Sequence, residues 1–171
     1  MGVGIQRLDF AEFYRMAKDE CLVTVLVSVG DRDLAQELVA EAFARAWARW
    51  RTVGSHPAPA AWVVRTALNA HVSRWRRHRR EVPLADPGVL ADRPAAVETS
   101  DRPVDPRIMA ALLRLPERQR QVVALRLFLD LDTARTAAAL GIAPGTVQAH
   151  LGRAIAALRA DLMPEQKEIP S

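Results

Sequence analysis

Apolar residues recur at the three- and four-residue spacing of amphipathic helices over most of the chain. A first helix is predicted around Phe10, Phe13, Tyr14 and Ala17. The run CLVTVLVSV at residues 21–29 has the β-branched content of a strand, but its alanine-rich surroundings favour a buried helix. The pattern therefore predicts an all-α fold.

A second helix is predicted from Asp31, which can cap its N-terminus, to about Arg51. At about 100° per residue, one side collects the predicted core stripe, made of Val39, Phe43, Ala46, Trp47 and Trp50. The other side presents Leu34, Glu37, Leu38, Glu41 and Arg45. Leucines beside glutamates suit a protein-docking surface, and a plain solvated face fits the pattern equally well.

A third long helix is predicted from about Pro59 to Arg80. Its apolar stripe consists of Ala61, Val64, Leu68, Val72 and Trp75. A different face carries Trp62, Arg65, Thr66, Asn69, Ser73 and Arg76. An aromatic ring, an amide and cations are the groups that stack on, hydrogen-bond to and neutralise single-stranded nucleic acid. The helix ends in RWRRHRR, which indicates a phosphate-binding end or, without a ligand, a solvated charged terminus.

The C-terminal half predicts two helices broken at Leu115-Pro116, followed by a short helix through Ala134–Leu140. Gly141 can adopt the left-handed turn conformation, and a further helix begins near Pro144. That last helix has a buried stripe of Val147, Leu151, Ala154 and Leu158 and an outward face of Ala149, Gly152, Arg153 and Ala156. Helix, glycine turn and helix form the helix-turn-helix pattern, whose second helix enters the DNA major groove; an ordinary α-hairpin is the alternative.

Composition narrows the class of protein. The chain has 171 residues, a net charge of +4, and arginine as 22 of its 24 basic residues. Arginine reads phosphates and base edges well, although a GC-rich genome also produces arginine-rich chains. The chain has a single cysteine, Cys21, which excludes an internal disulfide. Its four histidines are scattered without the spacing of metal ligands, so neither a metal nor a cofactor is predicted. No apolar run reaches the roughly 20 residues of a membrane span and the N-terminus is unlike a signal peptide, so a soluble cytoplasmic protein is predicted.

Charge divides the chain into three parts. Residues 1–80 are net +5, residues 81–106 are net −4, and residues 107–171 are net +3. The middle part holds five of the eleven prolines, which prevent a continuous helix. We therefore predict two small helical domains, at 8–80 and 107–163, joined by an acidic Pro-rich linker at 81–106 that by itself is only a spacer.

Three segments together resemble the extracytoplasmic-function (ECF) sigma factors of bacterial RNA polymerase. GDRDLAQELVAEAFARAWARW is similar to sigma regions 2.1–2.2, and AWVVRTALNAHVSRWRRHRR is similar to regions 2.3–2.4. LPERQRQVVALRLFLDLDTARTAAALGIAPGTVQAHLGRAIAAL is similar to region 4. The opening Leu-Pro-Glu-Arg-Gln-Arg, the later Gly-Thr-Val and both halves in this order are distinctive of that family.

The resemblance implies a role for each surface. A polymerase core-binding site, on the β′ coiled-coil, would comprise Leu34, Glu37, Leu38, Glu41 and Arg45. A minus-ten DNA-binding site would comprise Trp62, Arg65, Asn69, Ser73, Arg74, Arg76, Arg77, Arg79 and Arg80. A minus-thirty-five DNA-binding site would comprise Thr146, Gln148, Ala149, His150 and Arg153, with the domain resting on the β flap. The acidic linker would thread near the RNA exit path. The sequence leaves open whether an anti-sigma factor binds.

The resemblance implies a non-enzymatic transcription subunit, and the sequence has no activated nucleophile, paired-carboxylate pocket or phosphate loop. The chain departs from the family at Ala40, Ser73, Arg135 and Thr136, where Gln, Asp, Glu and Ile are usual. Two alternatives remain. A helix-turn-helix regulator would bind duplex DNA without polymerase, and a degenerate sigma would bind proteins without opening promoters. Run-off transcription with core polymerase distinguishes all three.

Overall fold

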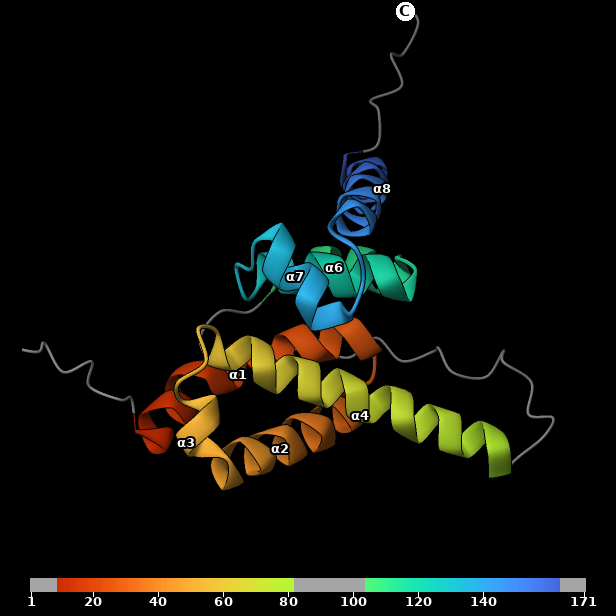
Figure 1. The fold of residues 1–171 in the computed structure, drawn as a ribbon. Helices are drawn as coiled ribbons and strands as arrows, with labels where there is room; N and C mark the ends of the chain where they lie inside the picture. Colours follow the sequence, from red (N-terminus) through yellow and green to blue (C-terminus); the bar gives the residue numbers. More distant parts are fainter. Residues whose placement is uncertain (1–8, 82–103, 164–171) are drawn as a thin grey trace, which may run out of the picture.

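The computed structural model describes residues 9–81 and 104–163, and every regular element in these two stretches is an α-helix, as predicted (Figure 1). Most of the predicted linker, residues 82–103, lies outside the described residues. The helices are α1 (Phe10–Val29), α2 (Arg32–Ala48), α3 (Trp50–Val53), α4 (Pro59–Glu81), α5 (Pro106–Arg114), α6 (Glu117–Leu127), α7 (Thr133–Leu140) and α8 (Pro144–Leu162).

The first group of helices is built on α1, which joins the first predicted helix and the run at 21–29 in one element. The prediction of a helix for this run is confirmed. Gly30 ends α1 with a left-handed φ of 77°, a conformation that glycine adopts without a steric penalty. Asp31 then caps α2 as predicted, because its carboxylate accepts a hydrogen bond from the Leu34 backbone N–H at 2.9 Å.

The core of this group lies between α1, α2 and α4. Phe13 of α1 stacks on Trp50 of α3 with 5.0 Å between ring centroids, and it also contacts Phe43 of α2. From α4, Val63 and Val64 are fully buried. These contacts fix the rotation of α2 and α4 and hence the faces that each helix turns outward.

The prediction that Trp47 belongs to the core is wrong, because its side chain is 69% exposed. Leu38, predicted to face outward, is fully buried, and Leu34 is half-buried against the core. Helix α2 packs against both α1 and α4. Viewed down the helix axis, its buried side chains span an arc with Leu38 at one edge and Phe43 at the other, and Trp47 lies outside this arc.

Trp75 was also predicted in the apolar stripe of α4, and this is wrong as well. The buried residues of α4 end at Leu68, and Trp75 is 51% exposed. The C-terminal part of α4 extends past the other helices (Figure 1). The Arg79 guanidinium lies 4.6 Å from the centre of the Trp75 ring, a cation–π contact that covers part of the ring.

The second group of helices contains the predicted helix-turn-helix. A break at Leu115-Pro116 separates α5 from α6, as predicted. Gly141 has the left-handed φ of 65° predicted for the turn between α7 and α8. Val147 of α8 is fully buried against Val122 of α6 and Ala137 of α7, and this contact fixes how α8 is rotated. The helix-turn-helix prediction is confirmed at the level of geometry.

The two groups pack directly against each other. Helix α1 contacts α6 extensively, and α4 contacts α7. Val23 and Val27 of α1 lie in one apolar cluster with Leu112 of α5 and Val123 of α6. In return, Leu125 of α6 is buried in the core of the first group. The apolar run at 21–29 is therefore covered on opposite sides by different halves of the chain.

Arg120 ties this junction together with its guanidinium. Its Nη1 donates to the carbonyls of Leu113 and Leu115 at 3.2 and 3.1 Å, and its Nη2 donates to the Ser28 carbonyl at 3.4 Å. The Ser28 carbonyl belongs to the last turn of α1, the negative end of the helix dipole. Burial lowers the pKa of Arg120, and nearby Glu117 partly opposes that shift.

Candidate nucleic-acid interface

One face of α4 gathers most of the predicted nucleic-acid contacts. At about 100° per residue, Trp62, Arg65, Asn69, Ser73, Arg76 and Arg80 fall within one narrow arc. Except for Trp62, which is half-buried, all of them are exposed. The arc runs the whole length of the helix, so an aromatic ring, an amide, a hydroxyl and three guanidinium groups follow one line. That line is about 30 Å long at 1.5 Å per residue, long enough to contact several nucleotides.

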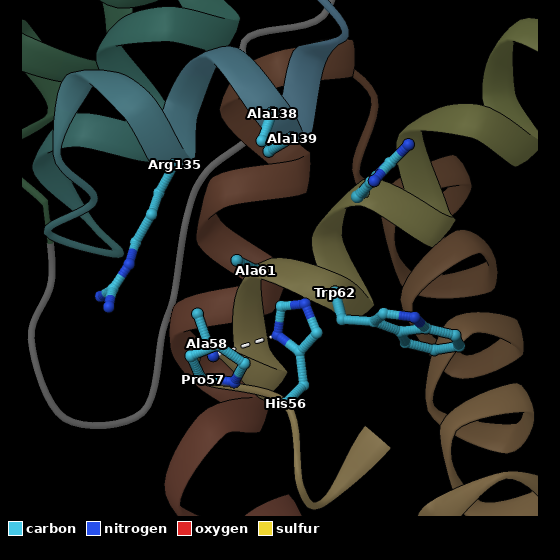
Figure 2. A pocket seen from close by; sticks show the side chains of 9 residues that line it. His56, Pro57, Ala58, Ala61, Trp62, Arg135, Ala138 and Ala139 are labelled. Atoms are coloured by element: carbon cyan, nitrogen blue, oxygen red, sulfur yellow. Dashed lines mark hydrogen bonds between the residues drawn. The ribbon is translucent and has the colours of Figure 1, made fainter. Parts of the chain in front are cut away.

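Trp62 borders a small, largely apolar hollow of about 110 Å³ between the start of α4 and helix α7 (Figure 2). In Figure 2, Arg135 of α7 and Trp62 lie on opposite sides of it. His56 stabilises the segment just before α4, because its Nδ1 accepts a hydrogen bond from the Ala58 backbone N–H at 3.0 Å. Trp62 is half-buried because it packs against the core of the first group, and in Figure 2 its ring points away from Arg135 and α7.

Asn69 and Ser73 border a larger and more polar hollow of about 430 Å³ between α2 and α4. Its other lining residues are Glu41, Arg45, Ala70, Arg74 and Arg77. The amide and hydroxyl predicted to meet unpaired bases thus lie beside a carboxylate predicted to bind polymerase. The predicted minus-ten DNA-binding surface and the predicted polymerase core-binding surface are therefore adjacent, although they were predicted as separate surfaces.

Arg74 makes the connection between them. Its Nη1 donates to Glu37 at 3.1 Å and its Nη2 donates to Glu41 at 2.9 Å, so one guanidinium spans two carboxylates of α2. The second oxygen of Glu41 accepts from Arg45 at 2.5 Å. Arg74 therefore differs from the other arginines of RWRRHRR, because two of its donors already bond to carboxylates of α2.

The outward face of α2 contains only part of the predicted docking surface. Glu37 and Arg45 are exposed and Glu41 is half-buried, whereas buried Leu38 cannot reach a partner. Trp47 is exposed as well, but at about 100° per residue it lies about 120° from Glu41, on a neighbouring face of α2. Its neighbours Ala44 and Ala48 are also exposed, and alanine carries no signal that separates an outer face from an inner one.

The outward face of α8 is shallow, as predicted. The exposed residues include Thr146, Gln148, Ala149 and Arg153. His150 is half-buried, and its shielded Nδ1 has no hydrogen-bond partner among the residues that the structure describes. The Gln148 amide does not point freely into solvent. Its Nε2 donates to the hydroxyl oxygen of Thr133, the first residue of α7, at 3.2 Å. No sequence signal beyond a threonine at a helix start would have found Thr133.

Within residues 9–81 and 104–163, no group of histidine, cysteine or carboxylate side chains is arranged to hold a metal ion. The same two stretches contain no helix that combines the length and the apolar character needed to cross a membrane. Cys21 is fully buried, and burial raises the pKa of its thiol well above the usual range.

Comparison with known proteins identifies the family to which the chain is similar. Residues 14–81 match the family model for sigma-70 region 2, and residues 106–158 match that for sigma-70 region 4. The first match covers all of α2 and α4, and the second covers α7 and all but the last residues of α8.

Curated relatives agree with both matches. The chain is 35% identical to the RNA polymerase sigma-E factor of Streptomyces coelicolor, over 91% of this chain and 87% of the relative. It is 32% identical to the ECF RNA polymerase sigma factor SigL of Mycobacterium tuberculosis, over 78% of this chain and 77% of that protein. Among solved structures, the fold resembles the sigma factor RpoE of Bartonella quintana, solved with the anti-sigma factor NepR. That match has a TM-score of 0.68 and 23% identity, covering 92% of this chain and 99% of RpoE.

Proposed function

Because the chain belongs to the ECF sigma factors of RNA polymerase, we propose that its three exposed faces divide the work of promoter recognition. The face of α4 binds the minus-ten element, α8 reads the minus-thirty-five element, and the outward face of α2 binds the polymerase core. The chain thereby acts as a binding subunit and contributes no catalytic group of its own. We assign the first two tasks to separate units, residues 8–80 and 107–163.

The line of groups on α4 carries the minus-ten proposal. Asn69 offers an amide that can hydrogen-bond to an unpaired base, and Trp62 offers a ring on which a base can stack. Arg65, Arg76 and Arg80 on the same arc can neutralise adjacent phosphates. Arg74 is set apart from these contacts by its two ion pairs with α2.

The carboxylates of α2 support the core-binding proposal. Glu37 and Glu41 lie one turn apart on an exposed face and would meet basic side chains of the β′ coiled-coil. Charge reversal to lysine is a poor test, because it would set two cations against Arg74 and disturb the contact between α2 and α4 as well. Neutralisation by Glu→Gln preserves the shape of both side chains and avoids that repulsion.

The test is a binding titration of the full chain with core RNA polymerase. Glu37→Gln with Glu41→Gln should weaken binding at least ten-fold, a loss that converts to about 1.4 kcal/mol. The matched control neutralises Glu12 and Glu20, two exposed glutamates of α1, and should leave affinity unchanged. Equal affinity of both double variants, each folded at the assay temperature, would contradict the assignment of this face.

A further inference from the structure

We propose that Thr133 is a positioning residue for sequence reading: its hydroxyl holds the Gln148 amide in the orientation that meets the base edge. This inference rests on the proposed reading of the minus-thirty-five element by α8. It adds a residue from α7, a helix that contributes no predicted base contact. The observation that carries it is the hydrogen bond from Gln148 Nε2 to Thr133 Oγ1.

The backbone under Gln148 is already fixed. The preceding residue, Val147, is fully buried against α6 and α7, so the rotation of α8 about its axis is set. The start of α7 is fixed too, because the Asp132 carboxylate caps it by accepting from the Arg135 N–H at 2.7 Å. What remains free in Gln148 is its long side chain, and ordering such a chain on binding costs free energy.

The hydrogen bond removes much of that freedom without using up the reading groups. A glutamine amide has two N–H donors and one carbonyl acceptor, and Thr133 engages a single donor. The second N–H and the Oε1 atom remain available for adenine N7 and the adenine amino group, the bidentate pair that glutamine makes in the major groove. The threonine hydroxyl still has its own proton to donate, and a DNA phosphate oxygen is an acceptor of suitable chemistry.

The proposal predicts a base-specific effect from a residue that touches no base. Thr133→Val preserves the side-chain shape but removes the acceptor, so discrimination at the base read by Gln148 should fall about two- to ten-fold. Thr133→Ser retains the hydroxyl and should keep the wild-type preference. In a Gln148→Ala background, Thr133→Val should have no further effect at that base, because there is no amide left to orient.

The experiment is a selection of randomised minus-thirty-five sequences by the full chain bound to core polymerase, with thermal denaturation of each variant. Thr146→Val is the matched control: Thr146 lies at the exposed start of α8, so its loss should weaken binding without changing base preference. An unchanged preference in Thr133→Val, beside a changed one in Gln148→Ala, would overturn this inference alone. Equal losses in Thr133→Ser and Thr133→Val would overturn it too. An unchanged preference in Gln148→Ala would overturn the assignment of Gln148 and the inference with it.

Discussion

The bridge from Arg74 to Glu37 and Glu41 should contribute measurably to the stability of the chain. The two ion pairs, at 3.1 and 2.9 Å, join α2 to α4 across their exposed edge. Exposed pairs contribute about 0.2–1 kcal/mol each, so Arg74→Gln should lower the free energy of unfolding by roughly 1 kcal/mol. For a chain of 171 residues, that loss corresponds to a fall in Tm of roughly 2–4 °C.

Thermal denaturation at two salt concentrations tests this account. Raising ionic strength from about 0.1 M to about 1 M shortens the screening length from about 10 Å to about 3 Å, so the gap between wild type and Arg74→Gln should shrink. Arg76→Gln is the matched control, since Arg76 is exposed on the same helix and no ion pair involving it appears in the described part of the chain. A Tm of Arg74→Gln equal to that of wild type at low salt, or a gap that ignores salt, would refute the reasoning.

Three further predictions follow from buried and exposed polar groups. Thr136→Val should raise the free energy of unfolding by about 1 kcal/mol in urea denaturation, because the Thr136 hydroxyl is buried and has no hydrogen-bond partner within residues 9–81 and 104–163. Cys21 should react with thiol reagents only as fast as the chain unfolds, because burial shields it and raises its pKa; rapid labelling of the native chain would contradict this. Asn69→Ala should leave Tm within about 1 °C of wild type but weaken permanganate reactivity at the minus-ten element, and normal reactivity would remove Asn69 from the site.

Alanine explains where the sequence interpretation of α2 went wrong. Ala42 and Ala46 are buried while Ala40, Ala44 and Ala48 are exposed, so alanine marks neither side of the helix. Ala35 is buried as well, so α2 contains six alanines, and the direction of its apolar side depended on a few large side chains. Including Trp47 rotated the predicted apolar stripe by part of a turn. Trp47 was therefore predicted to be buried and Leu38 to be exposed, and the structure shows the reverse.

Turns and caps, in contrast, were predictable because local chemistry determines them. Asp31 and Gly141 occupy the cap and the left-handed turn for reasons contained in their own side chains.

Contacts between distant segments were not predictable. The apolar character of residues 21–29 indicated burial, but it could not reveal that Leu112 and Val123 cover one side of α1. The pairing of Arg74 with α2 was equally out of reach, since 33 or more residues separate the partners.

On the proposed function, the packing of α1 against α6 sets a threshold for promoter binding. Two elements about 25 base pairs apart are separated by about 85 Å of B-form DNA, whereas α4, about 35 Å long, contacts α7 directly. On the proposed assignment of α4 and α8, engaging both elements at once requires the halves to separate. Separation would uncover the buried Val27, Leu112 and Leu125, at about 1.5–3 kcal/mol for each side chain fully exposed. On the proposed function, the apparent affinity of the free chain for a whole promoter is reduced by the fraction of chains in that separated state. The proposed function therefore predicts that the free chain binds a whole promoter more weakly than the chain bound to core polymerase does.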